Sequence, residues 1–207
     1  MGLKGDGRVF HLSHLLDGKA LKQALSDAGY SQTALAETLG ISCAHERQDV
    51  EVVFQRVRAD SQYNILVRLF WLGRAVPESA FREMLPALDV EGLTAVGLLS
   101  CERGTIQSSA RLAPYHDLLL ASDFGPELCR NLPSEHVLGV GAASLTLASL
   151  TIRRRVGTAL DLGTGAGIQA FLAIRHADHV IGTDTNPRAL NFAEFNAKLN
   201  GIEGVEW

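Results

Sequence analysis

A strand, a glycine-rich turn and a helix follow one another without interruption in the last third of the sequence. The run 156–162 is mostly apolar and predicts a short buried strand, and the apolar run 168–174 predicts a helix. Between them, Gly163, Gly165 and Gly167 let the backbone approach a ligand without a Cβ in the way. The N–H groups of the first helical turn can then receive an anionic group. This order is typical of the cofactor end of a doubly wound α/β fold.

A second strand and helix follow the first pair. The run 179–184 predicts a strand that ends on Asp184, 21 residues after Gly163, where a carboxylate can accept hydrogen bonds from both hydroxyls of a ribose. The run 187–200 predicts a helix, because a proline begins it and Asn-Gly ends it. Residues 205–207 begin a third predicted strand. The predicted fold class is therefore α/β, with a Rossmann-like sheet of which this chain holds only the first strands.

The glycine spacing separates two kinds of nucleotide site. Sites for nicotinamide and flavin dinucleotides usually carry GxGxxG, with the pyrophosphate at the helix N-terminus. This chain carries GxGxG instead, and Asp161 stands two residues before it. A carboxylate in that place suits the ammonium group of a methionine moiety. The pattern argues against a dinucleotide, and a nicotinamide-type Rossmann domain is kept as the alternative.

Two segments carry a resemblance to a known family. Leu-Asp-Leu-Gly-Thr-Gly-Ala-Gly at 160–167 resembles the first motif of class I S-adenosylmethionine-dependent methyltransferases. Gly-Thr-Asp-Thr-Asn-Pro-Arg-Ala-Leu at 182–190 resembles their second motif. The nearest resemblance is to the small-domain group, which includes release-factor glutamine methyltransferases and several rRNA base N-methyltransferases. The cofactor that this resemblance implies is S-adenosylmethionine.

The resemblance also implies roles for single residues. Asp161 would hold the methionine amino group, and Asp184 would bind the ribose. The segment 137–144 stands where such proteins have a loop and helix that close over the methionine end of the cofactor. The cofactor-binding residues expected in this way are Gly141, Ser144, Asp161, Gly163, Thr164, Gly165, Gly167, Asp184, Thr185 and Asn186.

The catalytic residues are not predicted, because this chain lacks one motif of the resembled group. In that group, Asn-Pro-Pro-aromatic follows a fourth strand and aligns the target nitrogen with the methyl group. No such motif occurs in the 207 residues, and we expect the chain to be a fragment of a longer protein. The predicted function is methyl transfer to an amide or amine nitrogen of a protein or RNA. The alternative is a non-catalytic module that binds protein or nucleic acid and carries a vestigial half of a Rossmann unit.

The sequence before residue 125 predicts a different kind of unit. Helical spacing of apolar residues predicts a series of helices, and three β-like runs follow them. Three helices and then a hairpin predict a winged-helix-like N-terminal domain, 1–125, ahead of a methyltransferase part, 126–207. Before residue 125 the predicted helices are 12–28, 31–39, 45–60, 63–72, 77–85 and 89–97, and the predicted strands are 97–101, 105–113 and 117–122. After that boundary a further helix is predicted at 142–150.

A winged helix raises the question of nucleic-acid binding. Its third helix would enter the DNA major groove, but the helix at 89–97 holds two acidic residues and no Lys or Arg. This charge argues against direct binding of duplex DNA and favours a cap or a substrate-presenting module. The triplet Arg153-Arg154-Arg155 either meets RNA phosphates or closes the C-terminus of the preceding helix, and we favour closure.

Charge, cysteines and hydropathy limit the remaining classes. The formal net charge of −4 does not indicate a nucleic-acid partner. Cys43, Cys101 and Cys129 are widely spaced and predict reduced thiols in a cytoplasmic protein. No run of the sequence has the length of a membrane span, so no membrane association is expected. His176 and His179 flank Asp178, but we expect a solvated turn there and no metal site.

Overall fold

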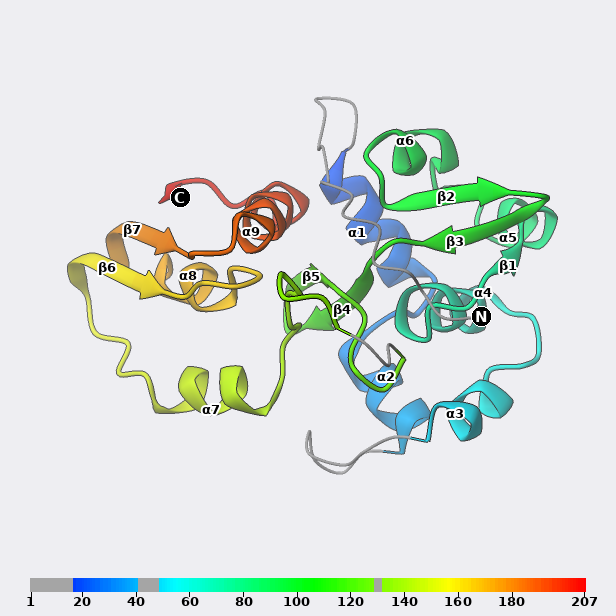
Figure 1. The fold of residues 1–207 in the computed structure, drawn as a ribbon, viewed down its shortest axis with the longest axis horizontal. Helices are drawn as coiled ribbons and strands as arrows, with labels where there is room; N and C mark the ends of the chain where they lie inside the picture. Colours follow the sequence, from blue (N-terminus) through cyan, green and yellow to red (C-terminus); the bar gives the residue numbers. More distant parts are fainter. Residues whose placement is uncertain (1–16, 41–48, 129–131) are drawn as a thin grey trace.

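The computed structural model describes residues 17–40, 49–128 and 132–207. A helical part and a parallel sheet lie on opposite sides of helix α9, Pro187–Asn200 (Figure 1). Residues 12–16 and 45–48, where two of the predicted helices begin, lie outside the described residues, as do Cys43 and Cys129. Cys101 is a free, exposed thiol.

The first helices begin at side-chain caps that the sequence carries. Asp17 accepts hydrogen bonds from two backbone N–H groups at the start of α1, Gly18–Asp27. Ser31 caps α2, Gln32–Leu39, which ends at Gly40 in the left-handed conformation. The helices that follow are α3 (Val50–Arg56), α4 (Gln62–Leu66), the π-helical turn η1 (Val67–Trp71), α5 (Glu78–Met84) and α6 (Val90–Ala95).

Two antiparallel sheets accompany these helices. Strands β1 (Val76–Pro77), β2 (Leu99–Glu102) and β3 (Thr105–Ser108) form one sheet in the order β1-β3-β2. Strands β4 (Arg111–Tyr115) and β5 (Leu118–Ser122) form a hairpin of their own. The prediction of one strand at 105–113 is wrong. The Ser108 hydroxyl donates to the Ala110 carbonyl at 2.6 Å, and this local bond bends the chain from the first sheet into the second.

The hairpin has a side chain bonded to its outer edge on the β4 side. The Tyr30 hydroxyl donates to the Leu112 carbonyl at 2.7 Å, and both residues are buried. Leu112 pairs with Ala121 of β5, and within the described residues β4 has no strand on its other side. Without Tyr30, the Leu112 carbonyl at this outer edge would have no hydrogen-bond partner among these residues. The first helices are thereby joined to the hairpin.

A parallel sheet forms the other part of the molecule. Strands β6 (Val156–Leu162), β7 (Ala177–Thr183) and β8 (Val205–Glu206) pair in the order β6-β7-β8. Helix α7 (Ala142–Leu150) precedes the sheet, and α8 (Ile168–Ala173) joins its first two strands. The Arg153 guanidinium donates to the Ala148 carbonyl at 2.6 Å, which confirms for this residue that the basic triplet closes α7.

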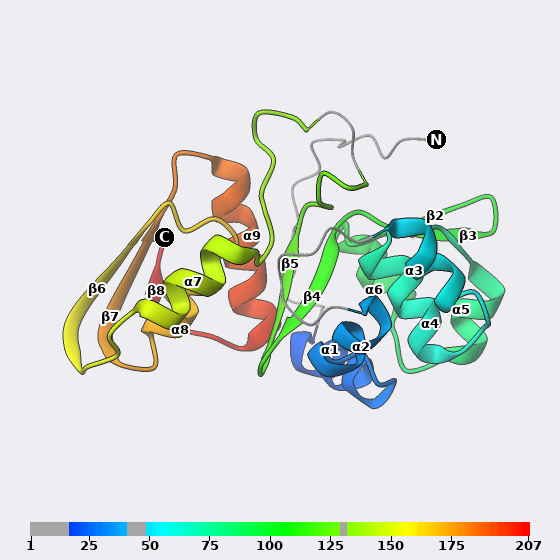
Figure 2. The same cartoon turned by 90° about the horizontal axis from the view of Figure 1, so that it is seen from below.

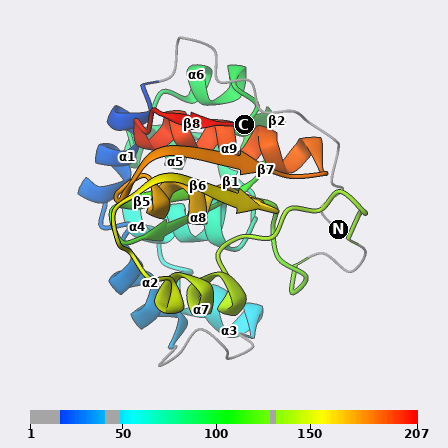
Figure 3. The same ribbon diagram turned by 90° about the vertical axis from the view of Figure 1, so that its left-hand side faces the viewer.

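The prediction that 156–162 is buried is wrong. Leu160 is 62% exposed and Leu162 is 83% exposed, and both point to the same face of β6. In Figure 3 the strands lie in front of α8 and α9, so these helices cover one face of the sheet. Parallel strands are usually covered on both faces, and within the described residues the second face carries no helix.

The apolar core continues across the predicted domain boundary. Phe70 and Phe81 of the helical part belong to the same buried cluster as Phe192, Phe195 and Leu199 of α9. Figure 2 shows α9 between the parallel sheet and the β4–β5 hairpin. The two parts therefore share α9 as a common packing surface, and the boundary near Gly125 stays a prediction.

Candidate cofactor site

The glycine turn begins with two hydrogen bonds to one carbonyl. The N–H groups of Gly163 and Thr164 both donate to the Thr183 carbonyl, each at 2.8 Å. This pairing holds the end of β6 against the end of β7, so the turn starts where both strands stop. Thr164 is 5% exposed and faces inward, which places the flanking glycines at the surface of the turn.

The three glycines serve two different purposes. All have positive φ: 75° at Gly163, 56° at Gly165 and 91° at Gly167. A Cβ at either of the first two would meet nothing within 4 Å, so both leave open space beside the backbone. A Cβ at Gly167 would lie 2.6 Å from the Phe171 ring. Gly163 and Gly165 therefore leave room for a ligand, whereas Gly167 allows α8 to pack.

Asp161 lies on β6 below this turn. Its Oδ2 accepts hydrogen bonds from the Thr164 hydroxyl at 2.6 Å and from the Ala170 N–H at 3.0 Å. Its Oδ1 has no hydrogen bond within the described residues. The carboxylate is therefore oriented by the start of α8, with one oxygen left to accept from a ligand.

Asp184 follows β7 and reaches back to the glycine turn. Its Oδ2 accepts from the Gly165 N–H at 2.9 Å, and its Oδ1 accepts from the Asn186 N–H at 2.9 Å. Each carboxylate oxygen has a second lone pair, so two acceptor positions remain. Asn186 caps α9 by accepting from the Arg188 N–H at 3.0 Å. Asp184 therefore holds the glycine turn and still has lone pairs that can accept hydrogen bonds from a ligand in the pocket.

These groups line one pocket of about 400 Å³. A volume of this size is within the usual range of small-molecule sites. Seven of the ten residues predicted for the cofactor line it: Ser144, Asp161, Gly163, Thr164, Gly165, Asp184 and Asn186. Gly141, Gly167 and Thr185 are not among its lining residues, and their contact with a cofactor stays a prediction.

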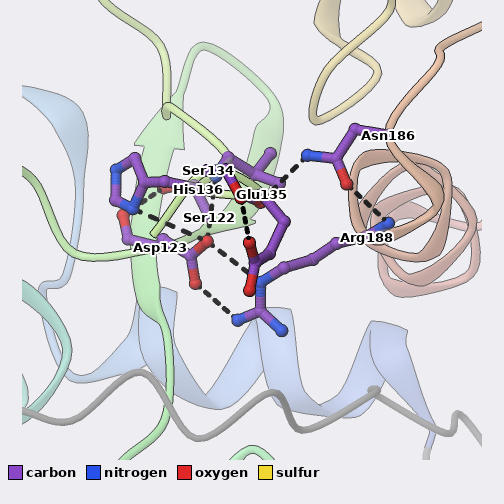
Figure 4. A network of polar contacts seen from close by, with 8 residues as sticks. Ser122, Asp123, Ser134, Glu135, His136, Asn186 and Arg188 are labelled. Atoms are coloured by element: carbon purple, nitrogen blue, oxygen red, sulfur yellow. Dashed lines mark hydrogen bonds and ion pairs between the residues drawn. The ribbon is translucent and has the colours of Figure 1, made fainter. Parts of the chain in front are cut away.

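The chain before α7 forms another wall of the pocket. Residues 136–140 line it, together with Ala143 and Leu147 of α7. Asp123, directly after β5, anchors this segment by accepting from the Val137 N–H at 2.9 Å (Figure 4). The Asn186 side chain donates to the Glu135 carbonyl at 2.9 Å. The segment is therefore held from both sides, by the hairpin and by the loop that carries Asp184.

A partly buried ion pair stabilises this anchor. The Arg188 guanidinium donates twice to the Asp123 carboxylate, at 2.6 and 3.1 Å. The two side chains are 15% and 13% exposed, so the pair is shielded from water. His136 lies beside it, with Nδ1 3.8 Å from Asp123 (Figure 4). Glu135 precedes His136 in the chain. Its carboxylate receives a hydrogen bond from Ser134, and this bond lowers the pKa of Glu135.

Some lining residues were not predicted from the sequence. Gln169 lies in the first turn of α8 and donates to the Ser144 carbonyl at 2.8 Å, so it joins α8 to α7 at the pocket. A polar residue in the first turn of an otherwise apolar helix, two residues after the last glycine of the turn, was the signal for it. His136 gave no such signal, because long-range folding alone brings it to this wall.

Comparisons with known proteins agree with this geometry. Residues 155–207 match the model of a methyltransferase domain. Residues 27–109 match a domain of unknown function, DUF7059. The first match spans the parallel sheet and the glycine turn, so this part of the chain is similar to a methyltransferase domain. The described residues hold no cluster of three or more His, Cys, Asp or Glu side chains arranged for a metal ion.

Curated relatives carry the same indication. The chain is 34% identical over 138 residues to a ribosomal protein L11 methyltransferase of Allorhizobium ampelinum, covering 61% of this chain and 44% of the relative. It is 37% identical over 86 residues to the protein of the same name from Geobacter metallireducens, covering 38% and 29%. It is 47% identical over 60 residues to the Geobacter sulfurreducens protein of that name, covering 28% of this chain and 20% of the relative. The chain spans less than half the length of these relatives.

One further property concerns membranes. Among the described residues, none of the helices combines the length and the apolar character that crossing a bilayer requires.

Proposed function

We propose that this chain is part of an S-adenosylmethionine-dependent methyltransferase and that its pocket receives that cofactor. The observation that carries the proposal is the convergence of Asp161, the open glycines and Asp184 on one pocket. The pocket fits the chemistry of the group. A ligand with an ammonium and a ribose needs two separate acceptor sites, and the two carboxylates supply them. The matching methyltransferase model supports the same assignment.

Each residue then has a defined task at the pocket. The free Oδ1 of Asp161 accepts from the ammonium of the methionine moiety, while Asp184 accepts from the ribose hydroxyls. Gly163 and Gly165 let the cofactor lie against the backbone. When bound, S-adenosylmethionine supplies a methyl group on a positively charged sulfur. The wall at 136–140 holds the cofactor in place, and transfer then depends on how an acceptor is aligned with it.

We infer that the methyl acceptor is a protein, with a nitrogen as its target. The relatives named as ribosomal protein L11 methyltransferases support a protein acceptor for this chain. RNA is the other acceptor class that the resembled group suggests. A ribosomal protein is therefore the first acceptor to test.

We also infer a winged-helix-like N-terminal unit, 1–125, that presents the acceptor to the methyltransferase part, 126–207. The order of the elements supports this inference: helix α4 with η1, strand β1, helices α5 and α6, then the β2–β3 hairpin. Pairing of β1 with β3 completes a small sheet beside these helices. Glu91 of α6 forms an ion pair with Arg82 of α5, and α6, the third helix, contains no Lys or Arg, so its own charge is negative. This charge favours a protein partner over duplex DNA.

A methyl-transfer assay tests the proposal. The longest natural chain that contains these residues is incubated with S-adenosylmethionine labelled in its methyl group, and with either purified ribosomal protein L11 or ribosomal RNA. We expect label in the protein and none in the RNA. An Asp184→Ala variant should transfer little label and serves as the control for the pocket. Label in RNA alone would contradict the acceptor assignment, and no transfer to either would contradict the activity.

A further inference from the structure

Asn196 is a polar side chain at the centre of the molecule. It lies in the C-terminal half of α9 and is fully buried, at 0% exposure. Its Oδ1 accepts from the Ala121 N–H at 2.7 Å. Its Nδ2 donates to the carbonyls of Ala121 and Ala166, both at 2.9 Å. One amide therefore binds the backbone of the hairpin and the backbone of the glycine turn together.

Asn200 makes the same contact with the hairpin one helical turn later. It accepts from the Leu119 N–H at 2.8 Å and donates to the Leu119 carbonyl at 2.7 Å. Its remaining donor goes to the Asn196 carbonyl, within its own helix. Leu119 and Ala121 are two residues apart, so they present their backbone groups on the same outer edge of β5. Both asparagines satisfy this edge, but only Asn196 reaches the pocket side.

Ala166 connects Asn196 to the candidate cofactor site. It lies between Gly165 and Gly167 in the glycine turn, and it lines the pocket. In its second half the turn is held at the Gly165 N–H by Asp184 and at the Ala166 carbonyl by Asn196. The first half of the turn is held by the Gly163 and Thr164 N–H groups, which donate to the Thr183 carbonyl. In the second half, where Gly165 and Gly167 have positive φ, the bond from Asn196 contributes to the shape of the turn.

We propose that Asn196 is a positioning residue of the cofactor site, which holds the glycine turn in its ligand-receiving shape and ties that shape to the β4–β5 hairpin. This inference rests on the proposed function. The chemistry requires an amide, since the position needs one acceptor and two donors in a plane. A carboxylate supplies no donor, and an apolar side chain leaves three backbone groups unpaired in the core.

The two asparagines provide a matched pair of variants. Asn196→Ala and Asn200→Ala each remove an amide from α9 and each leave one residue of β5 without its partners. Only Asn196→Ala also releases the glycine turn. We expect both variants to lose stability to a similar degree, as measured by urea unfolding. Binding and exchange are then measured well below the unfolding transition, on samples shown to be folded by circular dichroism.

Two readouts separate positioning from general stability. In the absence of ligand, amide hydrogen exchange of residues 164–167 should be about two- to tenfold faster in Asn196→Ala than in wild type, because one hydrogen bond is lost. Affinity for S-adenosylhomocysteine should fall by a similar factor. Asn200→Ala should leave both values unchanged. Equal effects of the two variants, or no effect of Asn196→Ala on the turn, would overturn the inference.

A measurement on the wild-type chain does not depend on how the variants fold. In a titration with S-adenosylhomocysteine, the side-chain amide resonance of Asn196 should shift, while that of Asn200 stays in place. A shift of Asn200 alone, or of neither in a chain that binds, would contradict the inference and leave the proposed function intact. If wild type does not bind the ligand, the proposed function fails instead, whereas exchange in the unliganded turn still reports on Asn196.

Discussion

At the scale of single residues, Asp184 is the side chain on which the cofactor assignment depends most. Asp184→Ala removes the carboxylate that we propose accepts from the ribose, and it also removes the partner of the Gly165 N–H. We expect affinity for S-adenosylhomocysteine to fall by about 1–3 kcal/mol, the usual cost of lost charge-assisted hydrogen bonds. Calorimetry measures this change. Asp178→Ala, at the opposite end of β7, is the control, and equal affinity of wild type and Asp184→Ala would remove the ribose assignment.

A second single residue, Tyr30, contributes to the stability of the fold. Its hydroxyl is buried against the Leu112 carbonyl, and burial raises its pKa above the ordinary value of 10.0. Tyr30→Phe leaves that carbonyl unpaired, and we expect a loss of about 1–3 kcal/mol in the free energy of unfolding at pH 7.

The pH dependence of this loss has a definite sign. Because the folded pKa is raised, the contribution of Tyr30 is complete below the unfolded value of 10.0. Above that pH the unfolded tyrosine ionises, and the advantage of wild type over Tyr30→Phe should shrink by up to about 1.4 kcal/mol per pH unit. Urea unfolding at pH 7 and above pH 10 tests this. A difference that is constant with pH would contradict it.

At the scale of elements, α1 and α9 approach each other through Gly18. A Cβ at this position would lie 2.7 Å from the Leu199 Cα and 2.8 Å from its carbonyl oxygen. Both are backbone atoms, so they do not move aside easily. Gly18→Ala should therefore cost about 1–3 kcal/mol in unfolding free energy.

Gly157 provides the comparison for this prediction. It lies on β6, and a Cβ there would meet nothing within 4 Å. Gly157→Ala should change the unfolding free energy by less than about 1 kcal/mol in either direction. Thermal or urea unfolding of the two variants is sufficient. A Gly18→Ala protein as stable as Gly157→Ala would show that the helices are not in close contact.

Elements with local signals were the ones that could be predicted from the sequence. Ser31 and Gly40 determine the bounds of α2, and the proline at 187 with Gly201 determines those of α9. The run 105–113 was mispredicted because the bend after Ser108 depends on a side-chain hydrogen bond that periodicity does not reveal. The exposure of Leu160 depends on which elements cover β6, and a single strand carries no such information.

The site was predicted to a similar extent and for similar reasons. Asp161, the glycine turn and Asp184 carry their spacing in the sequence, and the fold brings them to one pocket. The roles of Asn196 and Asp123 were not predictable, since their partners lie 75 and 65 residues away in the chain. An asparagine in a helix or an acid after a strand has many local explanations. Only the packing of α9 against β5 distinguishes among them.

At the scale of the whole molecule, an ion pair joins the hairpin to the parallel sheet. Arg175 donates to Asp117 at 2.6 Å, and this hydrogen bond lowers the pKa of Asp117 from its ordinary value of 3.8. The side chains are 47% and 68% exposed, so solvent screens the pair. Asp117→Asn should cost no more than about 0.2–1 kcal/mol at pH 7.

This small contribution also has a predictable pH range. Because the folded pKa of Asp117 is depressed, the contribution is present above the unfolded value of 3.8 and is lost as the pH falls through the folded pKa. Unfolding curves of wild type and Asp117→Asn should therefore converge in acid. A difference that grows as the pH falls would show that the pair does not join the two parts in solution.

The most direct test of the account is a calorimetric titration of S-adenosylhomocysteine, with NAD as the comparison ligand. It is performed on this 207-residue chain and on the longest natural chain that contains it. The account predicts saturable binding of S-adenosylhomocysteine at one site and no binding of NAD. Binding of NAD in its place would identify a dinucleotide site, and failure of both chains to bind S-adenosylhomocysteine would contradict the cofactor assignment.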